Sequence, residues 1–240
     1  MLYIQEGVKP LLNIKYCVAV LCYEQVAKRI ANILDNRIMK MMEKEISALE
    51  QEKERARKSA KSRLSFLTFA YKREASEFIA GHIMKSREYR DARCVMLYVS
   101  TDSEPGTEAL ITDILKSGKR AVLPRCLGKG TMEAVEIKDI SDLVPGKYGI
   151  PEPGPECMTV KPADINLCLV PCLAAGPDEN MKYVRLGHGA GYYDRFLPAL
   201  NCPTAVLCFG EMVRRVPMGK WDVPLDMLVT ERGIFQNGNV

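Results

Sequence analysis

Apolar residues in this chain fall into short uninterrupted runs that alternate with amphipathic segments. Continuous or alternating apolar runs predict strands at residues 93–100, 120–123, 131–137, 165–170, 204–209 and 227–229. Helical periodicity predicts helices at residues 68–84, 107–117 and 192–200. Because the strands are apolar throughout and are separated by helices, we expect an α/β fold of three layers, in which a mainly parallel sheet carries helices on both faces.

Local signals set the boundaries and the buried side of these elements. Gly118 is expected to end the helix at 107–117, and Pro124 to end the strand at 120–123. The apolar stripe of the helix at 68–84 is expected to consist of Phe69, Ala70, Phe78, Ile79 and Ile83.

The N-terminal part of the chain has a different pattern. Residues 1–42 carry apolar positions that lead into no motif, and we interpret them as an extension of unknown role. Residues 43–63 are rich in charged helix formers, with acidic residues first and basic residues last, an order that complements a helix dipole. We therefore expect an N-terminal helical arm that opens a single α/β domain at residues 43–240.

Composition narrows the functional classes. The 240 residues carry a net charge of +4, whereas a nucleic-acid binder usually has a stronger and more clustered excess. The nine cysteines are odd in number and contain no C-x-x-C pair, as expected of free thiols in a reducing compartment, and with two histidines a zinc site is not expected. The apolar stretch at residues 16–23 is far shorter than the roughly 18 residues that span a bilayer. We expect a cytoplasmic protein that binds no membrane.

The densest chemical signal is the glycine-rich segment at residues 185–194, Arg185-Leu-Gly-His-Gly-Ala-Gly-Tyr-Tyr-Asp194. Its three alternate glycines allow positive φ angles and a close approach of the backbone to a ligand. The helix expected from Tyr192 would direct unpaired N–H groups to the same place, and Arg185 could bind phosphate oxygens through its two-pronged guanidinium group. The segment matches neither a Walker loop nor the dinucleotide pattern, and a tight turn without a ligand is the alternative.

Five further side chains are candidates, each with a structural alternative. Asp194 could hold Mg²⁺ beside phosphates, or only stabilise the first turn of a helix. Asp222 and Asp226 could be its partners, or turn or cap residues. Lys53 and Arg57 share one helical face and could bind phosphates, or only be solvated.

Glu104 follows a predicted strand, where ligands bind in open α/β sheets, although a turn at Pro105-Gly106 explains the segment about as well. His188 could reach phosphate from within the glycine-rich segment.

Together these motifs resemble the 5-formyltetrahydrofolate cyclo-ligase family, also called 5,10-methenyltetrahydrofolate synthetases, from about residue 50 to residue 231. The most specific element is the glycine-rich segment followed by Arg195-Phe-Leu197. The other elements occur in the family's order: Lys53 with Arg57, Glu104 with Thr107, Leu123-Pro124-Arg125, Tyr148-Gly-Ile-Pro-Glu-Pro153, Val170-Pro171, and Asp222 after Val216-Pro217.

The resemblance implies an enzyme that closes a ring on a reduced folate, with ATP as co-substrate and Mg²⁺ as cofactor. We expect the protein to be a monomer. It implies that Asp194 and Asp222 hold the metal, that Arg185 and Asp194 are catalytic, and that Val99 and Glu104 line the folate pocket. The residues that would hold ATP are Lys53, Arg57, Arg185, Leu186, Gly187, His188, Gly189, Ala190, Gly191, Tyr192 and Tyr193.

The sequence also departs from the family pattern. The Pro-Gly-x-x-Phe-Asp turn that usually precedes the arginine is absent, although Asp178 could replace its aspartate by a shifted register, and Met212 stands where a glutamine is common. A substrate-altered or non-catalytic relative that binds folate or nucleotide is therefore the alternative hypothesis. A third hypothesis, nucleic-acid contact by the basic residues 55–63, is weakened by the scarcity of aromatic residues there.

Overall fold

The computed structural model describes residues 38–236 and divides the chain into two compact units, Met1–Glu50 and Gln51–Val240. In the first unit the described residues 38–50 are helical, and residues 51–64 of the second unit are helical too. Most of the predicted extension at residues 1–42 lies outside the described residues. No helix within residues 38–236 has the length and apolarity to cross a membrane.

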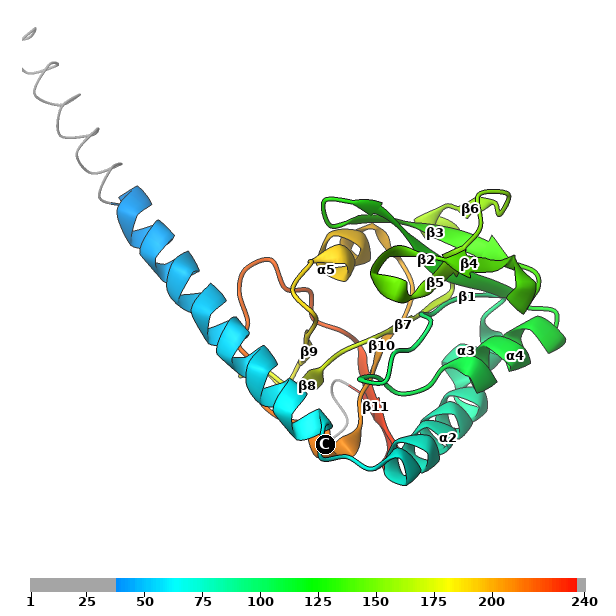
Figure 1. Cartoon of the computed structure of the whole chain (residues 1–240), viewed down its shortest axis with the longest axis horizontal. Helices are drawn as coiled ribbons and strands as arrows, with labels where there is room; N and C mark the ends of the chain where they lie inside the picture. The colour runs from blue at the N-terminus through cyan, green and yellow to red at the C-terminus, as the bar shows by residue number, and fades with distance from the viewer. Residues whose placement is uncertain (1–37, 237–240) are drawn as a thin grey trace, which may run out of the picture. The chain divides into compact units, whose positions relative to one another are not determined.

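An eight-stranded sheet forms the centre of the second unit, in the order β12-β11-β10-β7-β1-β2-β3-β6 (Figure 1). Five neighbouring strands are mutually parallel: β11 (Met227–Thr230), β10 (Thr204–Leu207), β7 (Leu167–Val170), β1 (Cys94–Met96) and β2 (Arg120–Gly128). The antiparallel strands are β12 (Gly233–Gln236), β3 (Thr131–Ile137) and β6 (Thr159–Val160). The predicted mainly parallel sheet is confirmed.

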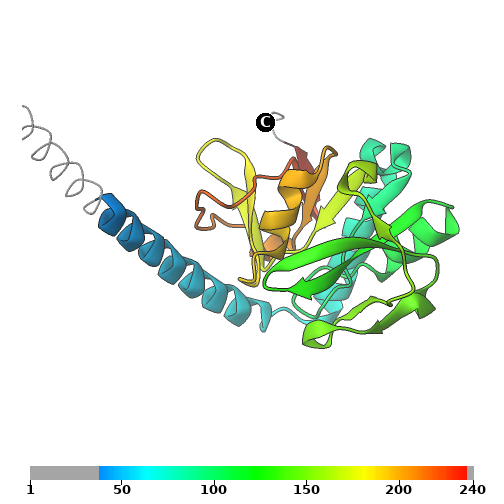
Figure 2. The ribbon, with the colours of Figure 1, turned by 90° about the horizontal axis from the view of Figure 1, so that it is seen from above.

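Alternate residues of the central strands enter two separate apolar cores. In β7, Leu167 and Leu169 belong to one core, whereas Cys168 and Val170 belong to the other. The first core packs against α2 (Phe69–Lys85), α3 (Arg87–Asp91) and α4 (Glu108–Lys116), and the second against α5 (Tyr192–Phe196) and the helical residues 51–64. Both faces of the sheet are therefore covered, as the apolar strands predict (Figure 2).

The helix α2 begins where the sequence predicts, because the Thr68 hydroxyl accepts a hydrogen bond from the Tyr71 N–H. Its predicted apolar stripe is partly wrong. Phe69 and Phe78 are 80% and 53% exposed, and the buried residues are Ala75, Ile79, Ala80 and Ile83. Ala70 is exposed as well, so of the predicted stripe only Ile79 and Ile83 are buried.

The prediction that Pro124 ends its strand is wrong, because β2 continues to Gly128. The pairing of β1 with β2 stops at Val122, whereas β3 pairs with β2 along its whole length. Beyond Val122 β2 thus has a neighbour on one side only. The missing N–H of Pro124 therefore leaves no ladder partner unsatisfied.

Several short elements carry no strong sequence signal. The hairpin of β8 (Ala174–Pro177) and β9 (Tyr183–Leu186) lies within the segment that departs from the family pattern. The second two-stranded sheet pairs β4 (Leu143–Pro145) with β5 (Pro151–Pro153). The 3₁₀ helices are Ile140–Asp142, Lys147–Gly149, Pro162–Asp164, Leu197–Ala199 and Gly210–Met212. Alanine, glycine and proline make up all of β8, so β propensity could not predict it.

Candidate active site

The candidate residues gather where the parallel strands end. Glu104 lies in the loop after β1, the β8–β9 hairpin follows β7, and the glycine-rich segment begins at the end of β9. Ligands of open α/β sheets bind at the carboxyl ends of the strands, and these connections all leave from that edge.

The glycine loop, defined as residues 187–191, joins β9 to α5. Gly189 and Gly191 have φ angles of +106° and +69°, which other residues rarely adopt. Gly187 is needed for a different reason, because a Cβ atom there would lie 2.5 Å from Nη1 of Arg185. Two of the three glycines therefore shape the backbone, and the third makes room for a guanidinium group.

Arg185 and Asp194 form an ion pair beneath the glycine loop. Nη2 of Arg185 donates to Oδ1 of Asp194 at 2.9 Å, and the two side chains are 6% and 26% exposed. The Arg185 guanidinium group also lies 5.3 Å from the ring centroid of Tyr193, within cation–π range. The positive charge is thus fixed in place, with little freedom to move on ligand binding.

Two buried polar atoms at this pair have no hydrogen-bond partner among the described residues: Nε of Arg185 and the hydroxyl of Tyr193. Burial raises the pKa of Tyr193 well above its usual value, so the hydroxyl keeps its proton and can donate. Buried donors are normally satisfied by protein, water or ligand. A water molecule or a ligand could supply the missing acceptor for either donor.

The glycine loop is tied to the β2–β3 hairpin by Arg195. Its Nη1 donates to the carbonyl oxygens of Gly130, Ala190 and Gly191 at 3.1, 2.9 and 3.0 Å. Arg195 entered the sequence analysis only as part of a motif. Its structural role was missed because Gly130 lies 65 residues earlier in the chain.

Lys53 and Arg57 both reach this region from the helical residues 51–64, four positions apart. Nε of Arg57 donates to the Gly187 carbonyl oxygen at 3.2 Å. Nζ of Lys53 contacts both carboxylate oxygens of Asp222, at 2.8 and 2.6 Å. Asp222 and Gly187 therefore contact side chains one helical turn apart.

Glu104 and His188 connect the loop after β1 to the glycine loop. Nε2 of His188 lies 3.3 Å from Oε1 of Glu104, and the Glu104 side chain is only 6% exposed. Oε2 of Glu104 accepts hydrogen bonds from the backbone N–H and the hydroxyl of Thr101, at 3.0 and 2.8 Å. The carboxylate is thereby oriented, with one oxygen directed toward the glycine loop.

Two predicted residues have less room to act through their side chains. Leu186 is 3% exposed and belongs to the core beneath α5, so only its backbone can contact a ligand. Val99 is partly buried and packs against the opposite core, which contains α2 and α4. Ala190 is exposed at the loop surface.

The contact between Tyr148 and Tyr192 was not predicted from the sequence. The hydroxyl groups of Tyr148 and Tyr192 lie 3.4 Å apart, and this hydrogen bond is the main cause that raises the pKa of Tyr192. Tyr148 has a positive φ of 62° and is 75% exposed. The neighbouring Tyr148-Gly149 sequence could have indicated an unusual turn, but not its contact with residue 192.

The predicted metal ligands are each paired with a cation. Asp194 pairs with Arg185, while Asp222 pairs with Lys53 and accepts from the Gly219 N–H at 2.6 Å. Within residues 38–236, no group of three or more His, Cys, Asp or Glu residues could hold a metal ion. Any metal held here would need oxygen ligands from water or substrate.

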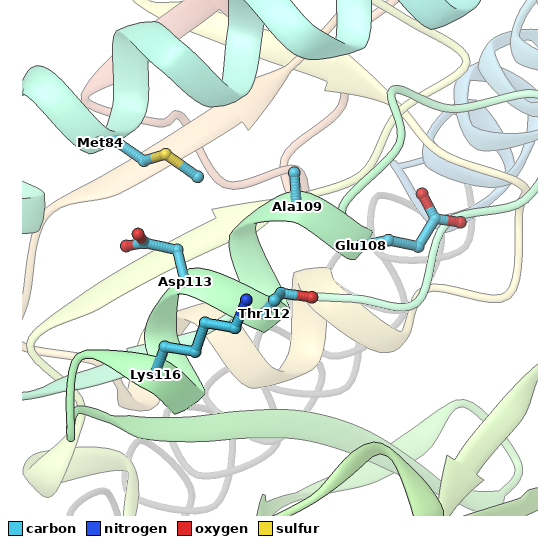
Figure 3. Close-up of a pocket in the computed structure, with 6 residues that line it drawn as sticks. All are labelled: Met84, Glu108, Ala109, Thr112, Asp113 and Lys116. Carbon is cyan, nitrogen blue, oxygen red and sulfur yellow. The ribbon is translucent and has the colours of Figure 1, made fainter.

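A separate surface depression lies between α2 and α4, on the face away from the glycine loop. Figure 3 shows its lining residues: Met84, Glu108, Ala109, Thr112, Asp113 and Lys116. The Asp113 carboxylate already accepts a hydrogen bond from the Tyr89 hydroxyl. The depression has none of the orphaned donors or glycine geometry of the site above.

Comparison with known proteins identifies relatives of this chain. The sequence model of the "5-formyltetrahydrofolate cyclo-ligase family" matches residues 49–231 of this chain. A probable 5-formyltetrahydrofolate cyclo-ligase of Schizosaccharomyces pombe is 30% identical over 177 residues, covering 66% of this chain and 85% of the relative. The 5-formyltetrahydrofolate cyclo-ligase of Escherichia coli K12 is 28% identical, covering 71% of this chain and 95% of the relative.

A solved structure of Aquifex aeolicus 5,10-methenyltetrahydrofolate synthetase superposes with a TM-score of 0.69 at 28% identity. The match covers 78% of this chain and 94% of that one. The fold, the glycine-rich segment and the extent of the match lead to one conclusion: this chain belongs to the 5-formyltetrahydrofolate cyclo-ligase family of enzymes.

Proposed function

We propose that this protein converts 5-formyltetrahydrofolate to 5,10-methenyltetrahydrofolate, using ATP and Mg²⁺ and releasing ADP and phosphate. The observation that carries the proposal is the double attachment of the glycine loop. Arg57 binds the Gly187 carbonyl oxygen, and the next residue, His188, contacts Glu104. A site for polyphosphate and a site for a heterocycle would thus share one loop.

The phosphates of ATP would lie against the glycine loop. Gly189 and Gly191 have left-handed backbones, and Gly191 is the N-cap of α5 and supplies no side-chain cap, so backbone N–H groups there would be available to phosphate oxygens. Lys53, Arg57 and Arg185 supply positive charge close to the loop. Such an arrangement is suited to the charge that spreads over phosphoryl oxygens during transfer.

The two aspartates fit the requirements of Mg²⁺, which needs only one or two carboxylates beside phosphates and water. Oδ2 of Asp194 takes no part in the ion pair with Arg185, and both oxygens of Asp222 face an ammonium group that polyphosphate could attract away. When bound, the ion would neutralise charge on the phosphates. Asp194 and Asp222 are the residues proposed to hold it.

The chemistry requires no nucleophile from the protein. The formyl oxygen of the substrate would attack the γ-phosphorus, and the bond from that phosphorus to ADP would break. N10 of the substrate would then attack the activated formyl carbon and lose its proton, and phosphate would leave as the ring closes. The protein would align these atoms, neutralise charge and exclude water.

Different residues of this chain would bind the phosphoryl group and the pterin ring. The fixed Arg185 would face the transferred phosphoryl group, and Nε of Arg185 with the Tyr193 hydroxyl would supply the two unsatisfied donors. Glu104, oriented by Thr101, would accept hydrogen bonds from N–H groups of the pterin ring, near Val99. The seven described cysteines are free, which supports a reducing compartment such as the cytoplasm. In that compartment we propose that the protein is a monomer. We also propose that it binds neither nucleic acid nor membrane.

The test is to mix the purified protein with 5-formyltetrahydrofolate, ATP and Mg²⁺ and to follow the absorbance of the methenyl product. Product that depends on both ATP and Mg²⁺ is expected. Folate binding without product, measured by calorimetry on the same sample, would instead support the non-catalytic relative, for which the unusual β8–β9 hairpin is the motivating observation.

A further inference from the structure

The single tryptophan of the chain, Trp221, lies at the tip of a turn beside the candidate site. The Asp222 N–H donates to the Gly219 carbonyl oxygen at 3.1 Å, and the Gly219 N–H donates to Asp222 Oδ2 at 2.6 Å. Lys220 and Trp221 therefore occupy the two central positions of a β-turn. At this tip Trp221 is 75% exposed, although an indole group gains much from burial.

This turn is anchored next to the glycine loop. The Asp222 carboxylate is bound by Lys53, while Arg57, one helical turn further along, binds Gly187. Adjacent turns of a helix are about 5.4 Å apart along its axis. A nucleotide whose phosphates lie in the glycine loop has a base and a ribose that extend further than this distance.

The chemistry of the tip suits a nucleotide. The Lys220 ammonium group lies 4.8 Å from the centroid of the Trp221 ring, so a cation and a flat aromatic surface stand together. A planar base can stack on indole, and phosphates can attract lysine. Glu104, which contacts His188, offers a carboxylate instead of a flat aromatic surface. The base of ATP and not the folate therefore fits the tryptophan end.

We infer that Trp221 is the surface on which the base of ATP stacks, which makes it a determinant of nucleotide binding and base selectivity. The inference rests on the proposed function, because it takes ATP as the nucleotide and the glycine loop as the seat of its phosphates.

The first experiment uses the fluorescence of Trp221 in the full-length protein, excited where tyrosine does not absorb. Because no other tryptophan is present, the signal reports residue 221 alone. ADP and ATP are expected to quench the emission in a saturable manner, whereas inorganic triphosphate is expected to bind without quenching. Equal quenching by inorganic triphosphate would overturn the inference, since the ring would then report phosphate binding. Quenching by 5-formyltetrahydrofolate alone would overturn it in favour of the folate.

The second experiment uses substitutions. Trp221→Ala is expected to raise the KM for ATP about tenfold, the scale of lost base stacking, with kcat nearly unchanged. Trp221→Phe should restore most of the loss, and the preference for ATP over other nucleoside triphosphates should shrink in the alanine variant. The matched control is Phe69→Ala, which removes an equally exposed ring at the start of α2. An unchanged KM in Trp221→Ala, or the same change in the control, would overturn the inference.

These outcomes separate the two proposals. Nucleotide-dependent quenching without methenyl product would refute the proposed activity and leave the role of Trp221 intact. Methenyl product without quenching by ATP would support the proposed activity and refute the role of Trp221.

Discussion

The two faces of the central sheet use the same strands for different purposes. Toward α2 and α4, the buried residues are mostly aliphatic, and Ile79, Ile83, Leu110 and Ile114 are almost completely buried. Toward α5, the core contains four buried cysteines and Tyr193, and the Tyr193 hydroxyl and Nε of Arg185 have no hydrogen-bond partner among the described residues. Burial raises the pKa of Cys168 and Cys172, so both thiols stay protonated.

This difference indicates that the face toward α2 and α4 serves mainly stability, whereas the face toward α5 serves ligand binding. The aliphatic face gains most from apolar burial and contains few groups that need a partner. The other face keeps unsatisfied donors, which cost stability unless a ligand accepts from them. Successive residues in one strand serve the two faces alternately, so substitutions one residue apart should have different consequences.

The largest expected effect is at the ligand face. Asp194→Asn should lower kcat at least about a hundredfold, because a neutral amide binds a metal ion poorly while keeping the shape of the side chain. Asp194→Ala should abolish turnover. Steady-state kinetics test the effect, and circular dichroism should show a native fold. Turnover close to the original value would refute the metal role of Asp194.

On the opposite face the loss should appear in stability. Ile79→Ala should lower the free energy of unfolding by about 2–5 kcal/mol, because it leaves a cavity in a fully buried site. Urea titration measures this loss, and the KM values of the folded variant should not change. Cys172→Ala removes only a sulfur atom and should lose less. A changed KM in Ile79→Ala would mean that the two faces are not independent.

A smaller effect is expected from the helix at residues 51–64. Lys53→Ala should raise the KM for ATP about tenfold, because it removes one charge-assisted contact beside the phosphates. Lys58→Ala, at an exposed position of the same helix, is the matched control and should behave as the original protein. Equal KM values for the two variants would count against a role of this helix in the site.

The smallest expected effect is on the KM for ATP when a glycine with positive φ is replaced by alanine. Two such variants distinguish backbone strain from a steric contact with Arg57. Gly189→Ala and Gly118→Ala both place a side chain at positive φ, and each should lose about 1–2 kcal/mol of stability. A Cβ atom at Gly189 would also lie 3.2 Å from Cζ of Arg57, whereas Gly118 has open space. Only Gly189→Ala should therefore raise the KM for ATP, by a few-fold. If both variants changed KM alike, loop geometry would not be the cause.

Much of the fold could be predicted from the sequence, because the central strands are apolar on both faces. The strand β3 was predicted with its observed bounds, α2 follows its predicted N-cap Thr68 and ends one residue later than predicted, and α4 is one residue shorter than predicted at each end. The prediction failed where tertiary context outweighs local preference. Pro124 is tolerated because β2 has lost one neighbour there, and β8 is held by pairing with β9.

The site was predictable in its residue types but not in its contacts. Lys53, Arg57, Glu104 and the glycine-rich segment could be named from their motifs. Neither the Lys53–Asp222 ion pair nor the contact of His188 with Glu104 could be derived, because 169 and 84 residues separate the partners. Such pairings depend on how the strands are ordered, which periodicity alone does not specify.

Arg195 connects position 130 to the glycine loop, because its guanidinium group binds the Gly130 carbonyl oxygen. A Cβ atom on Gly130 would overlap the Arg195 guanidinium group that holds the glycine loop. A Cβ atom there would also lie 2.6 Å from the Ala190 carbonyl oxygen, and Gly130 has a positive φ of 73°. A shorter residue at position 195 would release the hairpin tip and the loop together, but it would not make room for a side chain at position 130. In a library of random variants, position 130 should therefore remain glycine even where position 195 has changed.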